Sequence, residues 1–169
     1  MICPFKKEHR FAESNKAGSK GEATVIEWLN SADNVKRVTD VSDDKKWQEK
    51  DVDLLVLFDN GRMLKMEVKT DSYKTGNFFY ETISNKSKGS SGCFEYTDAD
   101  FIIYYYSELK ILYLMETKKL RRWFHLYKPR LEKMKKEVVN KYYKSEGYAI
   151  PIRMIKKHDW VKEYKGVGI

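Results

Sequence analysis

The fold is decided by residues 50–71, which read KDVDLLVLFDNGRMLKMEVKTD. Apolar and polar side chains alternate through residues 62–69, as in a β-strand with one buried face. Residues 59–61, Asp-Asn-Gly, are the strongest turn signal in the chain. The stretch therefore predicts a β-hairpin, with its first strand at residues 51–58 and its return strand at residues 62–69.

The length of the hairpin loop decides which side chains meet across the two strands. A two-residue turn would place Asp53 opposite Val68, on the face away from Glu67 and Lys69. A three-residue loop, with Gly61 left-handed in a bulge, instead places Asp53 directly opposite Glu67, where paired Cβ atoms lie about 4.5–5.5 Å apart. Sequence preference alone does not choose between the loops. A site that shares two carboxylates requires the three-residue loop, and we predict it.

These hairpin side chains suit a hard divalent cation. Mg²⁺ takes oxygen ligands, typically one or two carboxylates plus water and phosphate. Asp53 and Glu67 would supply the carboxylates, and the backbone carbonyl of Val68 is a further candidate oxygen ligand. Lys69 cannot bind a cation while charged, but beside one it can orient a water or neutralise charge on a phosphate. The pattern therefore predicts hydrolysis of a phosphodiester bond.

An amphipathic helix is predicted for residues 14–30, capped by the serine or asparagine at its start. Gly18 and Gly21 are poor helix formers, and a close approach of the first turn to the sheet is one reason for them. Glu22 falls on the apolar side of this helix. A carboxylate on a buried face is costly unless it is compensated. Glu22 therefore either reaches solvent at the rim of the stripe or faces a metal or a lysine, where it would hold a second ion.

The remainder of the chain predicts further strands and helices around one core. Strands are expected at residues 35–41, 77–83, 99–106, 109–115 and 148–155, the last at a sheet edge because it contains Pro151. Helices are expected at residues 117–127, ended by Pro129, and at residues 130–144, with a turn or short helix near Trp160. The aromatic residues 78–80 are either core or a base-stacking platform, and core is the commoner role for a strand. No repeat divides the chain, so residues 1–169 are expected to form a single domain.

The net charge of +8 is concentrated in one segment. Residues 117–146 hold eleven Lys or Arg and three Glu, an excess that equals the net charge of the whole chain. Aromatic residues are interleaved with these bases, so the segment can grip phosphates through salt-dependent, largely sequence-independent contacts. A charge run is equally typical of a solvated helix face, and the sequence does not choose between these two roles.

The composition excludes several classes of protein. A chain of 169 residues with 41% hydrophobic and 34% charged residues is typical of a soluble globular domain. Residues 101–106 are too short an apolar run to cross a bilayer, and the first ten residues lack a signal-peptide pattern, so we expect a cytosolic protein with no membrane partner. Cys3 and Cys93 are expected to be free thiols. The three histidines match no zinc spacing, and the chain has no nucleotide-binding glycine loop.

Asp53, thirteen intervening residues and then Glu67-Val68-Lys69 resemble the D…(D/E)xK signature of the PD-(D/E)xK nuclease superfamily. A glutamate on an N-terminal helix after a small-residue turn, here Glu22, strengthens the resemblance, as do the hydrophobic residues around the two motif halves. The resemblance is greatest for small stand-alone members, such as archaeal-type Holliday-junction resolvases and short phage nucleases.

The resemblance covers about residues 18–106 and implies a restriction-endonuclease-like α/β fold, with a central mixed β-sheet flanked by helices. The basic segment at residues 117–146 lies outside the matched part and would add basic C-terminal helices to the same domain. The implied activity is that of a Mg²⁺- or Mn²⁺-dependent deoxyribonuclease in a bacterial or phage-infected cell. DNA, including branched DNA, is the implied partner, and two-fold substrates such as junctions would favour a homodimer.

Carried over by position, the resemblance makes Glu22, Asp53, Glu67 and Lys69 the catalytic set, with Asp51 a weaker neighbour. The implied metal ligands are Asp53, Glu67, Val68 and Glu22. The candidate DNA-binding residues are Lys86, Lys88, Lys118, Lys119, Arg121, Arg122, Lys128 and Arg130. Two alternatives stay open: a catalytically inactive DNA-binding protein that keeps the nuclease fold, and an interaction protein whose acidic pair is incidental.

Overall fold

The computed structural model describes residue 18, residues 20–139 and residues 142–169. Its centre is a six-stranded sheet in the order β1-β2-β3-β6-β7-β10. The strands are β1 (Val35–Asp40), β2 (Leu54–Phe58), β3 (Met63–Asp71), β6 (Phe101–Tyr106), β7 (Ile111–Glu116) and β10 (Val161–Lys165). Only β3 and β6 run parallel among these neighbours, so the sheet is mixed. The predicted α/β class, with a mixed central sheet flanked by helices, is confirmed.

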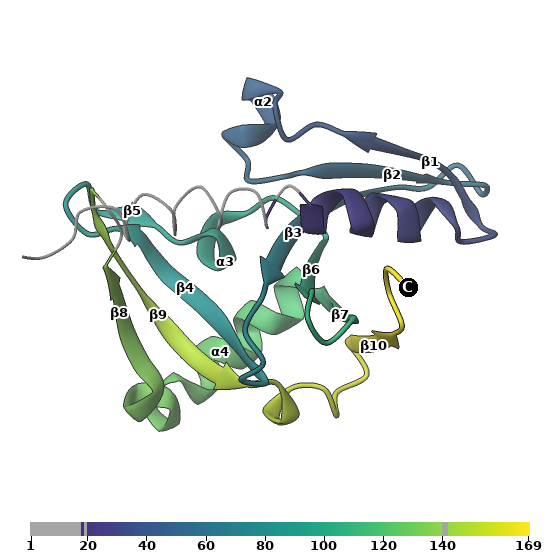
Figure 1. Cartoon of the computed structure of the whole chain (residues 1–169). Coiled ribbons are helices and arrows are strands. Elements are labelled where there is room, and N and C mark those ends of the chain that lie inside the picture. The colour runs from purple at the N-terminus through teal and green to yellow at the C-terminus, as the bar shows by residue number, and fades with distance from the viewer. Residues whose placement is uncertain (1–17, 19, 140–141) are drawn as a thin grey trace, which may run out of the picture.

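A second, four-stranded antiparallel sheet lies beside the central one (Figure 1). Its order is β5-β4-β9-β8, with β4 (Asn77–Asn85), β5 (Ser90–Ser91), β8 (Lys135–Val139) and β9 (Lys144–Pro151). The β4 and β5 strands lie in the connection between the parallel strands β3 and β6, whereas β8 and β9 follow α4 (Thr117–Leu131). This second sheet is thus built from two distant parts of the sequence.

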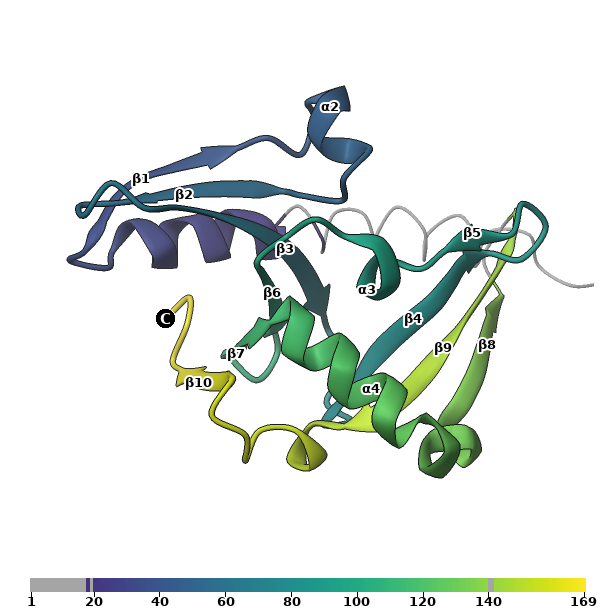
Figure 2. The same ribbon diagram turned by 180° about the vertical axis from the view of Figure 1, so that it is seen from behind.

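Helices cover both faces of the central sheet, as Figures 1 and 2 show from opposite sides. The N-terminal helix, described at residue 18 and over residues 20–30, packs Val25 and Leu29 against Val56 and Val68. On the other face, α4 packs with the second sheet in a larger aromatic core. The remaining short elements are α2 (Lys45–Gln48), α3 (Cys93–Tyr96) and the 3₁₀ turns η1 (Glu132–Met134) and η2 (Ile152–Met154). No described helix has the length and apolarity needed to span a membrane.

The hairpin has the three-residue loop that we predicted. The β2–β3 ladder pairs Leu54 with Met66, and the main-chain N–H of Phe58 donates to the carbonyl of Arg62 at 2.9 Å. Gly61 has φ +80°, the left-handed conformation that a glycine adopts without Cβ strain. A two-residue turn would have shifted the ladder by one residue and exchanged the two faces of β3.

The predicted second basic helix, residues 130–144, is wrong. After α4 the chain makes a 3₁₀ turn and continues as strand β8, which pairs with β9. In this ladder Lys135 lies opposite Tyr148, and Val139 lies opposite Lys144. The sequence Lys-Lys-Glu-Val-Val has weak helix propensity at its two valines, and strand pairing overrides what remains. Basic C-terminal helices are therefore replaced by a single helix and a basic hairpin. Pro129 lies inside the last turn of α4 rather than ending the helix at residue 127.

One further prediction near the C-terminus is corrected and another is confirmed. The last predicted strand, residues 148–155, is β9, which lies between β4 and β8 rather than at an edge. Pro151 is its final residue, so the missing N–H falls where the ladder already stops. The expected turn near Trp160 is confirmed, and it is followed by strand β10, which pairs with β7 from Val161 to Lys165 at the edge of the central sheet.

The aromatic residues of β4 are core. Phe78 and Tyr80 are fully buried, and the Tyr80 ring stacks on Phe124 of α4 with ring centroids 3.8 Å apart and on Phe94 of α3 at 4.8 Å. Such stacked rings bury large apolar areas and fix one geometry. Tyr80 thereby joins the second sheet, α3 and α4 into one core. The base-stacking alternative for residues 78 and 80 is excluded by their burial.

Gly21 explains how closely the N-terminal helix approaches β3. A Cβ atom on Gly21 would lie 2.2 Å from Thr70 Oγ1 and 2.8 Å from Thr70 Cβ, distances that real Cβ contacts do not reach. A Cβ atom on Gly18, by contrast, would have no heavy atom of the described residues within 4 Å. The predicted close approach therefore holds at Gly21 and not at Gly18.

We expect Gly21→Ala to lower the free energy of unfolding by about 1–3 kcal/mol, because the methyl group overpacks the helix–strand contact. Gly18→Ala is the matched control and should change stability little or raise it by up to about 1 kcal/mol through helix propensity. Urea denaturation of both variants measures the difference. Equal stability of the two variants would contradict the close contact.

Candidate active site

Strand β3 carries the centre of the candidate site. Glu67 and Lys69 pair with Ile102 and Tyr104 of β6, so they share the face that holds α4 and the second sheet. Val68 points to the other face, into the core under the N-terminal helix. Only 2% of Glu67 is exposed, and its Oε1 atom forms an ion pair with Lys69 Nζ. The Glu67 carboxylate is thus buried beside the Lys69 ammonium group.

Asp53 lies beside this pair at the start of β2. Its main-chain N–H donates to the Met66 carbonyl at 3.0 Å, and its Oδ2 atom accepts the Val68 N–H at 2.8 Å. Strand β2 begins at Leu54, so it offers no main-chain acceptor to the Val68 N–H. The Asp53 carboxylate accepts that hydrogen bond instead. Because Oδ2 is used in this way, Oδ1 is the oxygen that Asp53 can offer to a cation.

Asp51 approaches the same place through a strained backbone. It follows α2 and has φ +52°, a left-handed conformation that is uncommon for residues other than glycine. The Thr97 hydroxyl donates to the Asp51 carbonyl, and the Asp98 N–H donates to the Lys50 carbonyl at 2.8 Å. These bonds hold the turn from a second segment of the chain. Such strain is often retained at functional sites.

A wall of the site comes from α3, which lies between β3 and β4 in Figures 1 and 2. Cys93 is a buried free thiol at the start of α3. A Cβ atom on the preceding Gly92 would lie 2.2 Å from the Glu81 carbonyl oxygen, so only glycine lets α3 pack this closely on β4. The Glu81 side chain accepts a hydrogen bond from the Cys93 main chain. Glu81 is therefore a supporting group at the edge of the site.

Three groups come close enough to share one cation. One ligand atom each of Asp51, Glu67 and Cys93 lies within 4.8 Å of the other two. Sequence reasoning treated Asp51 as a weak neighbour and did not place Cys93 in the site. Cys93 is far from the motif in sequence, and only the packing of Gly92 on β4 would have indicated its position.

We call Asp51, Glu67 and Cys93 the acidic cluster. Burial and the closeness of several acids shift the pKa values of its carboxyl groups. Burial, with a further contribution from Asp53 and Asp51, raises the pKa of Glu67 to about 9 despite the opposing effect of Lys69. Burial also raises the pKa of Asp51. For Lys69, burial favours the neutral amine, but Cys93, Glu67 and Asp51 outweigh it, and its pKa lies above the ordinary value. Lys69 is thus a single positive charge among several acidic groups.

The chemistry of the cluster fits a bound divalent cation. Asp51 Oδ2 and Glu67 Oε2 are both buried and have no hydrogen-bond partner among the described residues. Buried polar atoms without partners are rare and costly in folded proteins. A cation would satisfy both oxygens and stabilise the charged form of Glu67. Carboxylate oxygens are the ligands that Mg²⁺ and Mn²⁺ prefer, whereas the thiol of Cys93 is not.

Glu22 reaches the edge of this cluster from the N-terminal helix. The side chain is partly buried, and burial followed by repulsion from Asp53 and Asp40 raises its pKa. Lys69 acts in the opposite direction. Glu22 is therefore partly exposed and lies within electrostatic range of Asp53 and Lys69. A role in metal binding stays a prediction.

The candidate DNA-binding residues do not form one uniform surface. The Arg121 guanidinium is partly buried and donates to the Phe94 and Thr97 carbonyls, both at 2.6 Å, so it holds α3 in place. Lys86 forms ion pairs with Glu137 and Glu146 at 3.0 and 3.2 Å. The other predicted contacts are exposed: Lys88, Lys118, Lys119, Arg122, Lys128 and Arg130, of which Lys119 pairs with Glu116.

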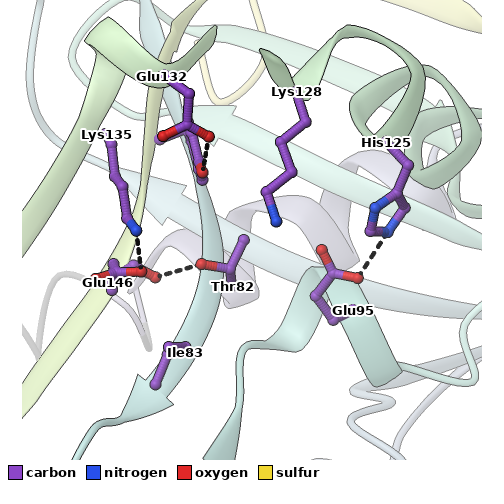
Figure 3. Close-up of a pocket in the computed structure, with 9 residues that line it drawn as sticks. Thr82, Ile83, Glu95, His125, Lys128, Glu132, Lys135 and Glu146 are labelled. Atoms are coloured by element: carbon purple, nitrogen blue, oxygen red, sulfur yellow. Dashed lines mark hydrogen bonds and ion pairs between the residues drawn. The ribbon is translucent and has the colours of Figure 1, made fainter.

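A separate pocket of about 460 Å³ lies between α3, α4 and the second sheet. Figure 3 shows its polar lining, with His125 beside Glu95 at 3.0 Å and Lys135 beside Glu146 at 2.9 Å. Tyr148 also donates to Glu132. The three carboxylates of the pocket are therefore satisfied within the protein, unlike those of the acidic cluster, and the pocket shares no lining residue with that cluster.

Comparisons with known proteins add little to this geometry. No protein-family model matches the chain, and no curated protein matches it. The solved structure of a bacterial homing endonuclease, I-Ssp6803I, is similar over 61% of this chain and 64% of that one, with 23% sequence identity and a TM-score of 0.41. The matched part spans less than two thirds of that structure. We take neither a site nor an activity from a similarity of this size.

The burial of Glu67 predicts how stability depends on pH when a chelator is present. Its pKa is about 9 in the folded protein against 4.5 ordinarily, so the folded state keeps a proton that the unfolded state releases. Stability should therefore fall as pH rises from about 4.5 towards about 9. Glu67→Gln removes this loss, and above about pH 8 it should melt higher than the parent by about 2–4 °C or more, the equivalent of about 1 kcal/mol.

Thermal unfolding at several pH values measures this difference. Glu27→Gln, which changes an exposed glutamate of the N-terminal helix, is the matched control and should keep the parent's pH dependence. Parallel pH profiles for the parent and Glu67→Gln would contradict a buried, proton-retaining Glu67.

Proposed function

We propose that the chain is a metal-dependent DNA nuclease. The observation that carries the proposal is the pair of buried carboxylate oxygens of Asp51 and Glu67, which have no partner in the described part of the chain and lie near Asp53 and Lys69. An interaction protein gains nothing from an acid kept inside the fold at such electrostatic cost. A cation-dependent enzyme does, since the same acids bind the cation strongly because they are poorly solvated.

Asp53 and Glu67 would hold the cation, with Asp51 close by and the Val68 carbonyl and Glu22 as further candidate ligands. When bound, a hard cation such as Mg²⁺ or Mn²⁺ supplies Lewis-acid stabilisation of the charge on a scissile phosphate. The protein's own contribution is positional. The Val68 N–H fixes one oxygen of Asp53, so the carboxylate is oriented before any substrate arrives.

Lys69 is the second working group of the proposed site. Its side chain is 35% exposed and its Nζ atom pairs with the buried Glu67 carboxylate, so Lys69 lies between that carboxylate and the surface. There it can donate to a phosphate oxygen or hold an attacking water, since the lysine remains charged. The Asp, Glu and Lys together correspond to the PD-(D/E)xK motif, and membership of that superfamily is part of this proposal.

Exposed bases of α4 and the 85–92 loop would contact the DNA backbone. Lys118, Arg122 and Lys128 are exposed on α4, and Lys88 lies on the loop. Contacts of this kind position a duplex without reading its sequence. Arg121 is left out of this role because its guanidinium holds α3. Branched DNA as the preferred substrate, a homodimer and a cytoplasmic location belong to the proposal as its most detailed parts.

We expect Asp53→Asn and Lys69→Met to lower the cleavage rate by at least about 100-fold, because each removes a group that acts on the developing charge. DNA binding should persist in both variants. The assay uses linear, nicked, flapped and four-way-junction DNA with Mg²⁺ or Mn²⁺. Asp33→Asn and Lys36→Met change exposed residues of the same types and serve as controls.

Unchanged cleavage in the Asp53 or Lys69 variant would place the activity elsewhere. Binding without any cleavage by the parent chain would favour the second candidate function, a DNA-binding protein that keeps the nuclease fold. The buried acids argue against that candidate, because two carboxylates near a phosphate weaken binding unless a cation lies between them.

Neutralising Lys118, Arg122 and Lys128 together should reduce the slope of log Kd against log salt concentration by up to about 3, close to one unit for each lost phosphate contact. Fluorescence anisotropy with a labelled duplex measures this slope. A control that neutralises Lys36, Lys45 and Lys157, exposed bases outside the basic segment, removes the same charge. Equal slopes for the two variants would show that only the net charge matters.

A further inference from the structure

Cys93 gives the acidic cluster a property that a site of carboxylates alone does not have. Its Sγ atom and one oxygen each of Asp51 and Glu67 lie within 4.8 Å of one another. These atoms come from α3, from the turn after α2 and from β3, so three separate segments converge on one point. Small side-chain movements would bring them to the spacing of ligands around a single ion.

An independent observation marks the same point as a ligand site. Glu67 is 2% exposed, and its Oε2 atom has no hydrogen-bond partner among the described residues. The Asp51 Oδ2 atom is in the same condition. Both residues that share the cluster with the sulfur therefore have an unsatisfied oxygen with almost no solvent-exposed area. The strained backbone of Asp51 keeps its carboxylate there at an energetic cost.

Sulfur changes which cation the three groups prefer. Mg²⁺ requires hard oxygen ligands, and a thiolate offers it little. Zn²⁺ and Co²⁺ bind a mixture of cysteine sulfur and carboxylate oxygen well, most often with four ligands. A site with one thiolate and two carboxylates leaves a fourth position for water or for Asp53.

We propose that Asp51, Glu67 and Cys93 bind a thiophilic divalent cation such as Zn²⁺, and that this cation inhibits the enzyme. On binding, the Cys93 thiol and the protonated Glu67 carboxyl each release a proton to solvent, and the thiolate and the carboxylates of Glu67 and Asp51 coordinate the ion with no change of oxidation state. Inhibition follows because Glu67 serves both this ion and the hard cation of the active form, so the two cannot be held together. The inhibitory part rests on the proposed nuclease function, whereas the binding part does not.

Cobalt titration tests the binding part without any substrate. Co²⁺ bound to a thiolate gives a sulfur-to-metal charge-transfer band in the near ultraviolet, and Zn²⁺ in excess should abolish the band by competition. We expect this band with the parent chain and with Cys3→Ser, the matched control at the only other cysteine. Cys93→Ser should lose it. A band that persists in Cys93→Ser, or one that disappears in Cys3→Ser alone, would overturn the proposal.

A second variant keeps the test valid should Cys93→Ser fold poorly. Asp51→Asn retains both cysteines and should weaken Co²⁺ binding at least tenfold, because one anionic ligand is lost. Unchanged Co²⁺ affinity in Asp51→Asn would also overturn the three-residue site.

The inhibitory part needs DNA cleavage as a readout. The Zn²⁺ concentration for half-inhibition of Mg²⁺-dependent cleavage should rise at least tenfold in Cys93→Ser, with each protein compared with its own zinc-free rate. Equal half-inhibition concentrations in the parent and Cys93→Ser would overturn this part. Failure of the nuclease proposal is recognised separately, since the parent would then cut no DNA while the cobalt band remained.

Discussion

The structure depends on one unfavourable interaction, the burial of the Glu67 carboxylate on the central strand β3. A buried acid is tolerated when its surroundings either neutralise it or need it. Here Lys69 compensates one oxygen, and the other has no partner among the described residues. The neighbouring acids increase the cost rather than reduce it. The fold therefore gives up stability at the point where the proposed chemistry takes place, a common relation between stability and activity.

The hairpin register turns this local cost into a defined site. With Phe58 bonded to Arg62, the side chains of Asp53, Glu67 and Lys69 come together where β2 begins and β3 continues. The start of β2 at Leu54 matters as much as the register. It frees the Val68 N–H to orient Asp53, and Glu22 on the N-terminal helix lies within electrostatic range of Asp53 and Lys69.

The sequence predicted the central hairpin because its evidence is local: alternation in β3, a glycine that can be left-handed, and acids at fixed spacing. Cys93 was missed because its position depends on Gly92 packing against the Glu81 carbonyl, a contact between segments that no periodic pattern encodes. The prediction of a helix after Pro129 was wrong for a related reason. Its lysines and valines are compatible with helix or strand, and pairing with β9 decided the outcome.

The pairing of β4 with β9 has a consequence for how the chain folds. Glu81 pairs with Gly147, so this ladder joins residues far apart in sequence, whereas the β2–β3 hairpin closes over three residues. Non-local ladders form slowly because loop-closure entropy opposes them. The motif-bearing hairpin should form early, and the wall made by α3, which rests on β4, should be completed late. During refolding, affinity for cations would accordingly develop in the last kinetic phase, after most secondary structure has formed.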